Sequence, residues 1–168
     1  MILKQEPTIS AYKEKGNVLA NLKRYSEAIE DYKKAAELAE TDGEKETEAD
    51  LYLKIAKLYS SLGQKSSARS YARKSIALGF NSSEAHTFIG DLYMYSSDDC
   101  KSDDVLQYRS IYIAAYEEYK RAGNSAKMES AHQNFPSMEE IFVRNKKVGE
   151  SINTGCWIGE TVTLQKRW

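Results

Sequence analysis

Residues 12–38 read YKEKGNVLANLKRYSEAIEDYKKAAEL, and this stretch decides the fold class of the 168-residue chain. Two stripes with helical spacing run through it, separated by a short turn at residues 21–25. The first stripe is Tyr12, Gly16 and Leu19, and the second is Ala28, Ile29, Tyr32, Ala35 and Leu38. Neither stripe is wide enough to support an isolated helix, so each helix must pack on a neighbour. The stretch therefore predicts a pair of packed helices.

The same arrangement returns twice further along the chain. The second copy is Tyr52, Ala56 and Tyr59, followed by Ala68, Ala72 and Ile76, and the third begins with His86, Gly90 and Tyr93. Tyr52 and His86 lie 34 positions apart, whereas Tyr12 and Tyr52 lie 40 apart. We expect the six extra positions to form a longer solvated loop at Thr41–Glu46, which is polar and contains an Asp-Gly turn signal. Small residues at Gly16, Ala56 and Gly90 would let paired helices approach closely.

These residues resemble the tetratricopeptide repeat (TPR), whose period is 34 residues. The resemblance implies an all-α fold, a TPR α-solenoid in which antiparallel helix pairs form a right-handed superhelix, here with a short C-terminal β-hairpin. We expect three units at about residues 9–40, 49–79 and 83–122, a closing helix that ends by residue 135, and a tail at 136–168 that packs on the last repeat. The third unit departs from the pattern, because residues 97–103 replace its tight turn and a long helix follows from about Asp104 to Arg121, capped by Gly123.

The segment after Asn124 does not continue the repeat. Asn124–Asn134 can form a short helix, and Ser137 with Glu140 three residues later predicts a capped helix start. Residues 151–157 and 161–165 favour strands, so we expect a two-stranded hairpin. A hairpin of this size is marginal alone and must pack against the helices.

This tail is similar to the C-terminal end of a group of bacterial TPR proteins. The likeness rests on the loop that contains Cys100, the helix with Tyr112–Ala115, Phe135–Pro136, residues 138–142 and residues 155–161. Members of the group are often longer and commonly exported to the cell envelope. The resemblance implies a periplasmic or envelope location if the chain is a fragment of a longer exported protein. The protein would be cytoplasmic if Met1 is the natural start.

Charge and composition narrow the classes of partner. Hydrophobic residues make up 41% and charged residues 29% of the chain, and the net charge is −1. Apart from Arg144, Lys146, Lys147, Lys166 and Arg167, the basic residues are scattered, so nucleic-acid binding is not expected. No apolar run approaches the roughly 20 residues of a membrane span. We expect a protein or peptide partner and no small-molecule substrate.

The two cysteines, Cys100 and Cys156, exclude a disulfide-dense scaffold and a cysteine-based zinc site. We expect two separate thiols. The alternative is a single bridge between them, for which loop-closure entropy gives ~4 kcal/mol of stabilisation.

Candidate catalytic and metal-binding residues are few. His86 occupies the position of Tyr12 and Tyr52, so we interpret it as a packing residue, and we expect His132 to lie on the surface. Residues 98–104 contain four aspartates without the calcium-loop pattern, which favours a solvated acidic loop. Motifs for nucleotide binding and for hydrolytic catalysis are missing from the sequence. The sequence therefore predicts a protein that is not an enzyme, without cofactor, metal or catalytic residues.

In TPR proteins the first helices of successive units line a concave groove, and the resemblance places specific residues there. The expected groove positions are Lys13, Asn17, Asp50, Leu53, Lys57, Ser60, Glu84, Thr87, Asp91 and Met94. Lys13 and Asn17 also match the opening of the carboxylate clamp of TPR domains that bind chaperone C-termini. The other three clamp positions hold Lys54, Glu84 and Phe88, so we interpret Lys13 and Asn17 as general groove residues.

Two functional hypotheses remain open. The first is a protein–protein interaction module that binds a peptide or partner protein in the groove. The second is a structural module that caps a longer envelope-associated TPR protein or self-associates. The second hypothesis predicts an exposed apolar stripe near the first helix, with Ile2, Leu3 and Ile9 as candidates.

Overall fold

The fold is described by a computed structural model in which residues 7–168 are placed. Ile2 and Leu3, which we considered for an apolar stripe, lie outside these described residues. The chain divides into two compact units after Ala85. Each unit has its own architecture and is described separately.

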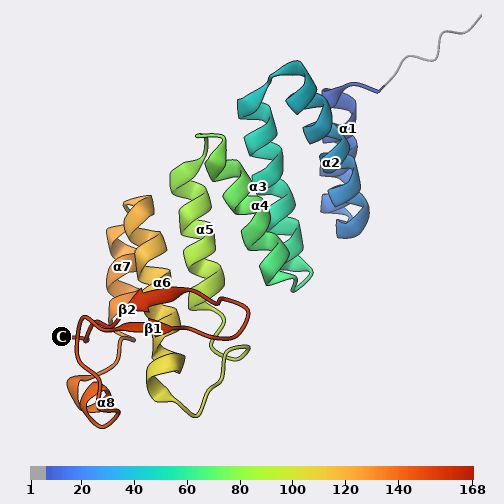
Figure 1. Ribbon diagram of the computed structural model, residues 1–168. Coiled ribbons are helices and arrows are strands. Elements are labelled where there is room, and N and C mark those ends of the chain that lie inside the picture. The colour runs from blue at the N-terminus through green and yellow to red at the C-terminus, as the bar shows by residue number, and fades with distance from the viewer. Residues whose placement is uncertain (1–6) are drawn as a thin grey trace, which may run out of the picture. The chain divides into compact units, whose positions relative to one another are not determined.

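The first unit consists of antiparallel helices in series: α1 (Ile9–Asn21), α2 (Tyr25–Asp42), α3 (Lys45–Ser61) and α4 (Lys65–Ala77) (Figure 1). Each helix packs on the next one in the chain. Its main hydrophobic cluster joins α2 to α3 through Ile29, Tyr32, Ala35, Ala36, Ala39, Leu51 and Ile55. The TPR-type helix pairs expected from the repeat are thus present.

Close contact between paired helices depends on the small residues of the first helices. A Cβ atom on Gly16 would lie 2.6 Å from the ring of Tyr32, and one on Gly90 in the second unit would lie 2.5 Å from the ring of Tyr119. In the second repeat, Ala56 and Ala72 occupy the positions of Gly16 and Tyr32, so two small residues face each other there instead of a glycine and a tyrosine. In the pairs Gly16–Tyr32 and Gly90–Tyr119, the ring of the tyrosine therefore fills the space that a side chain on the glycine would need.

The prediction of a loop at Thr41–Glu46 was wrong. Helix α2 continues through Asp42 and α3 starts at Lys45, so only Gly43 and Glu44 connect them. Gly43 has φ +75°, a left-handed conformation that ends the helix and costs glycine little. The six extra positions lengthen the helices instead, because most of this polar segment consists of residues that helices tolerate.

The second unit is built around α6 (Val105–Ala122), with α7 (Ser125–His132) packed against it and the short α8 (Met138–Phe142) beyond (Figure 1). Helix α5 (Ser82–Met94) crosses the division, and its residues from His86 onward belong to this unit. The side chain of Asp104 caps α6 by accepting a hydrogen bond from the Leu106 N–H at 2.9 Å. Gly123 ends α6 with φ +71°, as the sequence predicted.

The C-terminal hairpin is confirmed, with shorter strands than expected. Strands β1 (Ser151–Asn153) and β2 (Thr161–Thr163) pair antiparallel, with Ile152 opposite Val162. Both strands pack on α6 (Figure 1). Trp157, which we placed at the end of the first strand, instead donates from Nε1 to the Ser96 hydroxyl at 3.2 Å and contacts the Tyr93 ring. The first strand ends early because the chain turns before Trp157, at Gly155 and Cys156, where φ is +64° and +45°.

Cys100 and Cys156 form a disulfide, which corrects our expectation of two separate thiols. The bond joins the segment after α5 to the turn of the hairpin, across 56 positions of sequence. The two residues meet because the hairpin folds back onto the helices. Their spacing in the sequence contained no sign of this approach.

His132 is buried, with 6% of its surface exposed, so the expected surface position was also wrong. Its ring lies 4.5 Å from Phe135 and 3.9 Å from Trp168, measured between ring centroids. The end of the chain returns to this place, where the Arg167 N–H donates to the Pro136 carbonyl at 3.0 Å. Burial of His132 therefore depends on residues more than 30 positions away, which a local pattern does not reveal.

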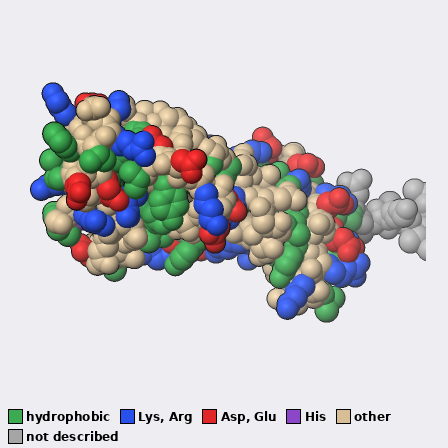
Figure 2. Space-filling model, turned by 90° about the horizontal axis from the view of Figure 1, so that it is seen from below, with side chains coloured by type: hydrophobic (Ala, Val, Ile, Leu, Met, Phe, Trp, Pro, Cys, Tyr) green, Lys and Arg blue, Asp and Glu red, His purple; other side chains and the backbone are tan. Residues whose placement is uncertain are grey.

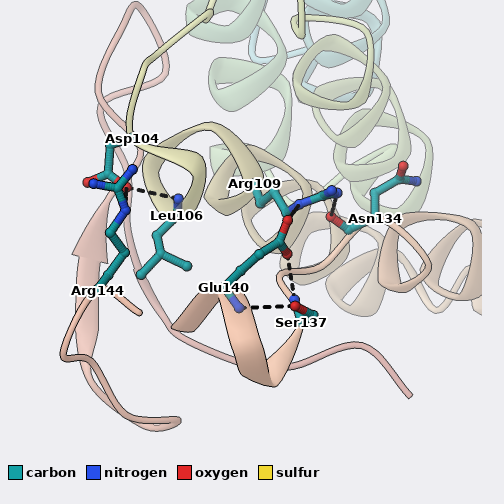
Figure 3. Close-up of polar contacts among 7 residues, drawn as sticks. All are labelled: Asp104, Leu106, Arg109, Asn134, Ser137, Glu140 and Arg144. Carbon is teal, nitrogen blue, oxygen red and sulfur yellow. Dashed lines mark hydrogen bonds and ion pairs between the residues drawn. The ribbon is translucent and has the colours of Figure 1, made fainter. Parts of the chain in front are cut away.

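A polar network fixes the start of α8 against α6 (Figure 3). Ser137 and Glu140 form the predicted capping box, in which each side chain accepts from the backbone N–H of the other residue. Arg109 of α6 donates from Nε to Glu140 at 2.9 Å and from Nη1 to the Asn134 carbonyl at 3.2 Å. Partial burial alone would raise the pKa of Glu140, but the hydrogen bonds from Ser137 and Arg109 outweigh it and hold the pKa below its usual range.

Candidate functional site

Most of the expected groove residues of the first unit lie on a surface formed by the first helices of its repeats. Lys13 of α1 forms an ion pair with Asp50 of α3 at 3.3 Å, and Lys57 of α3 pairs with Glu84 at the start of α5 at 2.6 Å. We call Lys13, Asn17, Asp50, Lys57 and Glu84 the first-helix surface. Its two ion pairs connect one first helix to the next, and their side chains are between 35% and 58% exposed.

Asn17 is held in one orientation by the second helix of its own repeat. The Tyr32 hydroxyl donates to Asn17 Oδ1 at 2.7 Å. Burial, together with the nearby Asp50 and Glu14 carboxylates, raises the pKa of Tyr32, so the phenol keeps its proton and remains a donor. With Oδ1 held in this way, the two amide N–H groups of Asn17 keep a fixed orientation as donors. The repeat pattern marks Tyr32 only as a packing residue and contains no signal for this role.

Leu53 lies apart from this surface. We expected it to be an apolar contact in the groove, but it is only 3% exposed and belongs to the core. Burial of this leucine removes apolar surface from water, and on a helix a shift of only one or two residues separates the buried face from the exposed one.

Of the remaining expected positions, Ser60 is half-buried on α3, and Thr87, Asp91 and Met94 lie in the second unit. Asp91 accepts a hydrogen bond from the Tyr119 hydroxyl at 2.7 Å and forms an ion pair with Lys127 of α7. Burial is the main cause that raises the pKa of Tyr119, and the hydrogen bond to Asp91 adds to it. Thr87 and Met94 are half-buried. Asp91 is therefore committed to contacts within its own unit.

His86 is mostly buried, as expected of a packing residue, but it also takes part in a polar network. Its Nδ1 lies 2.7 Å from Glu118, a carboxylate that is 4% exposed. Arg121, one turn further along α6, donates to the same carboxylate at 2.6 Å. The buried charge of Glu118 is thus compensated by two nitrogen groups. The i, i+3 spacing of Glu118 and Arg121 is the one signal in the sequence that indicates such a pair.

A cluster of tyrosines and lysines covers α3 and α4. Tyr71 stacks on Tyr59 with ring centroids 5.4 Å apart and contacts Tyr52 at 5.9 Å. Lys33 and Lys74 lie over these rings, between 4.8 and 5.6 Å from their centroids. The hydrogen bond from Lys33 to the Tyr59 hydroxyl raises the lysine pKa, and burial is the main cause that raises the pKa of Tyr52 to about 12. The chain's own lysines thus form cation–π contacts with the faces of these tyrosine rings.

Groups suited to a metal ion are missing from residues 7–168: these contain no cluster of three or more His, Cys, Asp or Glu side chains that could hold one. None of the helices in this range is long and apolar enough to cross a membrane.

Figure 2 views the molecule from the side on which α8 lies in Figure 1. On that face, Lys and Arg side chains are intermixed with Asp and Glu and with hydrophobic side chains.

Comparison with known families identifies the helix pairs of the first unit. A family model described as tetratricopeptide repeat matches residues 7–78, which comprise α1 to α4. Residues 7–78 are TPR repeats. Such repeats generally mediate protein–protein interaction, and the family is typically non-catalytic.

A solved structure similar to this chain is the crystal structure of BtubC (BKLC) from P. vanneervenii. The TM-score is 0.49 and the sequence identity 16%, and the match covers 92% of this chain and 72% of that one. A search among curated proteins found no match.

Proposed function

We propose that the TPR segment binds a peptide or partner protein on the first-helix surface. One observation carries the proposal: Lys13–Asp50 and Lys57–Glu84 form a row of exposed, oppositely charged groups across successive first helices. Exposed ion pairs of this kind contribute about 0–1 kcal/mol each, so a partner's charges can replace them at little cost. The same side chains then supply charge-assisted hydrogen bonds to the partner.

The partner chemistry that fits is a polar peptide with charges of both signs. A free C-terminal carboxylate fits poorly, because the neighbouring carboxylates of Asp50 and Glu84 would repel it. Asn17, oriented by Tyr32, adds amide donors for a backbone carbonyl of the peptide. The proposed role is non-enzymatic and needs no cofactor.

The test is affinity capture followed by measurement of binding with the protein it identifies. The first-helix variant combines Lys13→Ala, Asn17→Ala and Lys57→Ala. The matched control combines Lys120→Ala, Gln133→Ala and Lys147→Ala, three exposed residues of the second unit. We expect a partner that the wild type and the control retain and the first-helix variant loses, with an affinity loss of about tenfold or more. Equal capture by a folded first-helix variant would refute the proposal.

A second candidate function, self-association or stacking on further repeats, is favoured by α1. Val18 and Leu22 are 57% and 62% exposed. They occupy the positions of Leu58 and Leu62 in the next repeat, where Leu58 packs against the α2–α3 cluster. Ile9, which we considered for this stripe, instead packs on that cluster. A concentration-dependent increase in mass that Val18→Asp and Leu22→Asp abolish would support this function, and a monomer at all concentrations would exclude self-association.

A further inference from the structure

Strand β2 has an outer edge that no strand of the described residues covers, because the sheet consists of β1 and β2 alone. The Thr154 N–H donates to the Glu160 carbonyl and the Leu164 N–H to the Glu150 carbonyl, each at 2.8 Å. Hydrogen-bonded pairs alternate along an antiparallel ladder, so even-numbered residues of β2 bond to β1. The N–H and C=O groups of Thr161 and Thr163 therefore point to the outer edge, and both residues are exposed.

This edge borders a cavity of about 350 Å³ within the second unit. Consecutive residues of β2 form one wall, and Ala114, Glu117, Glu118 and Arg121 of α6 form the wall opposite. The volume is at the lower end of the range for ligand pockets, enough for side chains of a peptide. A chain lying along β2 would thus place alternate side chains in the cavity.

The cavity has an excess of negative charge. Its lining contains three carboxylates, Glu117, Glu118 and Glu160, and one guanidinium, Arg121. Glu118 is compensated by Arg121 and His86, whereas Glu117 is contacted by the neutral amide of Gln165 at 3.4 Å. A cationic side chain that enters along β2 would meet Glu117 without displacing an existing ion pair.

We propose that the outer edge of β2 binds an extended segment of a partner protein as an added strand, with a lysine or arginine directed at Glu117. The backbone groups of Thr161 and Thr163 supply the main-chain hydrogen bonds, and the cavity selects the basic side chain. The site lies in the second unit and goes beyond the binding proposed for the first-helix surface.

The probe is a fluorescent nine-residue peptide of alternating Thr and Val with a central Lys, compared with the same peptide carrying a central Glu. The main variant is Thr163→Pro, which removes an outward N–H. Its matched control is Ser151→Pro, because Ser151 pairs with Thr163 across the ladder and its N–H faces the other edge of the sheet. Proline is tolerated at strand edges. Tryptophan fluorescence, from Trp157 and Trp168, reports whether the second unit remains folded in both variants.

We expect saturable binding of the Lys peptide by the disulfide-bonded wild type, at least about tenfold tighter than the Glu peptide. Thr163→Pro should weaken binding about tenfold or more, Ser151→Pro less than twofold, and Glu117→Lys should reverse the preference between the peptides. The proposal is overturned if the wild type binds neither peptide or both equally, or if the two proline variants lose binding to the same extent. A dimer that Thr163→Pro dissociates and Ser151→Pro leaves intact would also overturn it, since a second copy of the chain would then occupy the edge.

Discussion

Gly16 shows how one missing side chain determines the fit of a helix pair. Tyr32 lies where the Cβ atom of any other residue would be, at 2.6 Å, and from there it also reaches Asn17. Gly16→Ala gains up to about 1 kcal/mol of helix propensity. It also forces the buried Tyr32 ring to move, and overpacking of this kind costs about 1–3 kcal/mol.

We therefore predict that Gly16→Ala lowers the free energy of unfolding by about 1–2 kcal/mol, measured by denaturant titration. The control is the Tyr32→Ala background, which is less stable but has no ring to displace. Adding Gly16→Ala there should raise stability, because only the gain in helix propensity remains. The same sign in both backgrounds would show that the contact with Tyr32 does not matter.

The residues that sequence reasoning misplaced share one physical cause. Leu53 was assigned to the surface and His132 to solvent, but both are buried, because tertiary contacts such as that between His132 and Trp168 decide exposure. The Cys100–Cys156 bond likewise depends on how the hairpin folds back. Lys13, Asp50, Lys57 and Glu84 were predicted for one surface, but their pairing across helices was not, since ion pairs are set by tertiary distances.

At the scale of elements, α8 is a five-residue helix that its sequence alone would not stabilise. The capping box and the Arg109–Glu140 ion pair stabilise this helix, which is too short to be stable by its own backbone hydrogen bonds (Figure 3). We predict that Glu140→Gln lowers the free energy of unfolding by about 1 kcal/mol at neutral pH. Glu139→Gln, a change of the exposed neighbour in the same helix, should have little effect.

The pH dependence of this difference follows from the lowered pKa of Glu140. A carboxyl group with a lowered pKa in the folded state contributes stability that is present above its unfolded pKa and lost as pH falls through the folded one. The gap between wild type and Glu140→Gln should therefore close under acidic conditions, in denaturant titrations followed from pH 7 to pH 3. A gap that is constant with pH would mean that the charge of Glu140 is not involved.

Element boundaries were predicted best where a local cap defines them. Ser137 and Gly123 lie where the capping rules place them, because their partners are only a few residues away. The connection between α2 and α3 was wrong, since polar residues suit a loop and an exposed helix equally well. The first strand was predicted too long because the chain turns at Gly155 and Cys156, where φ is positive, and leaves the ladder before Trp157.

At the scale of the whole molecule, the two compact units differ in what stabilises them. The first relies on helix pairs and the α2–α3 cluster, whereas the second also has the disulfide, which closes a loop of 56 positions. Both tryptophans of the chain, Trp157 and Trp168, lie in the second unit. Their fluorescence therefore reports on that unit, while hydrogen exchange can follow α1 to α4 separately.

We predict that the Cys100→Ser, Cys156→Ser double variant lowers the stability of the second unit by up to about 4 kcal/mol, because the unfolded chain regains the freedom of the opened loop. Tryptophan fluorescence during denaturant titration measures this loss, and a thiol reductant should reproduce it in the wild type but leave the double variant unchanged. Hydrogen exchange of α1 to α4 should stay the same, since both cysteines lie beyond Ala85. Protection lost equally from α1 to α4 would contradict this and would mean that the disulfide stabilises the chain as one cooperative unit.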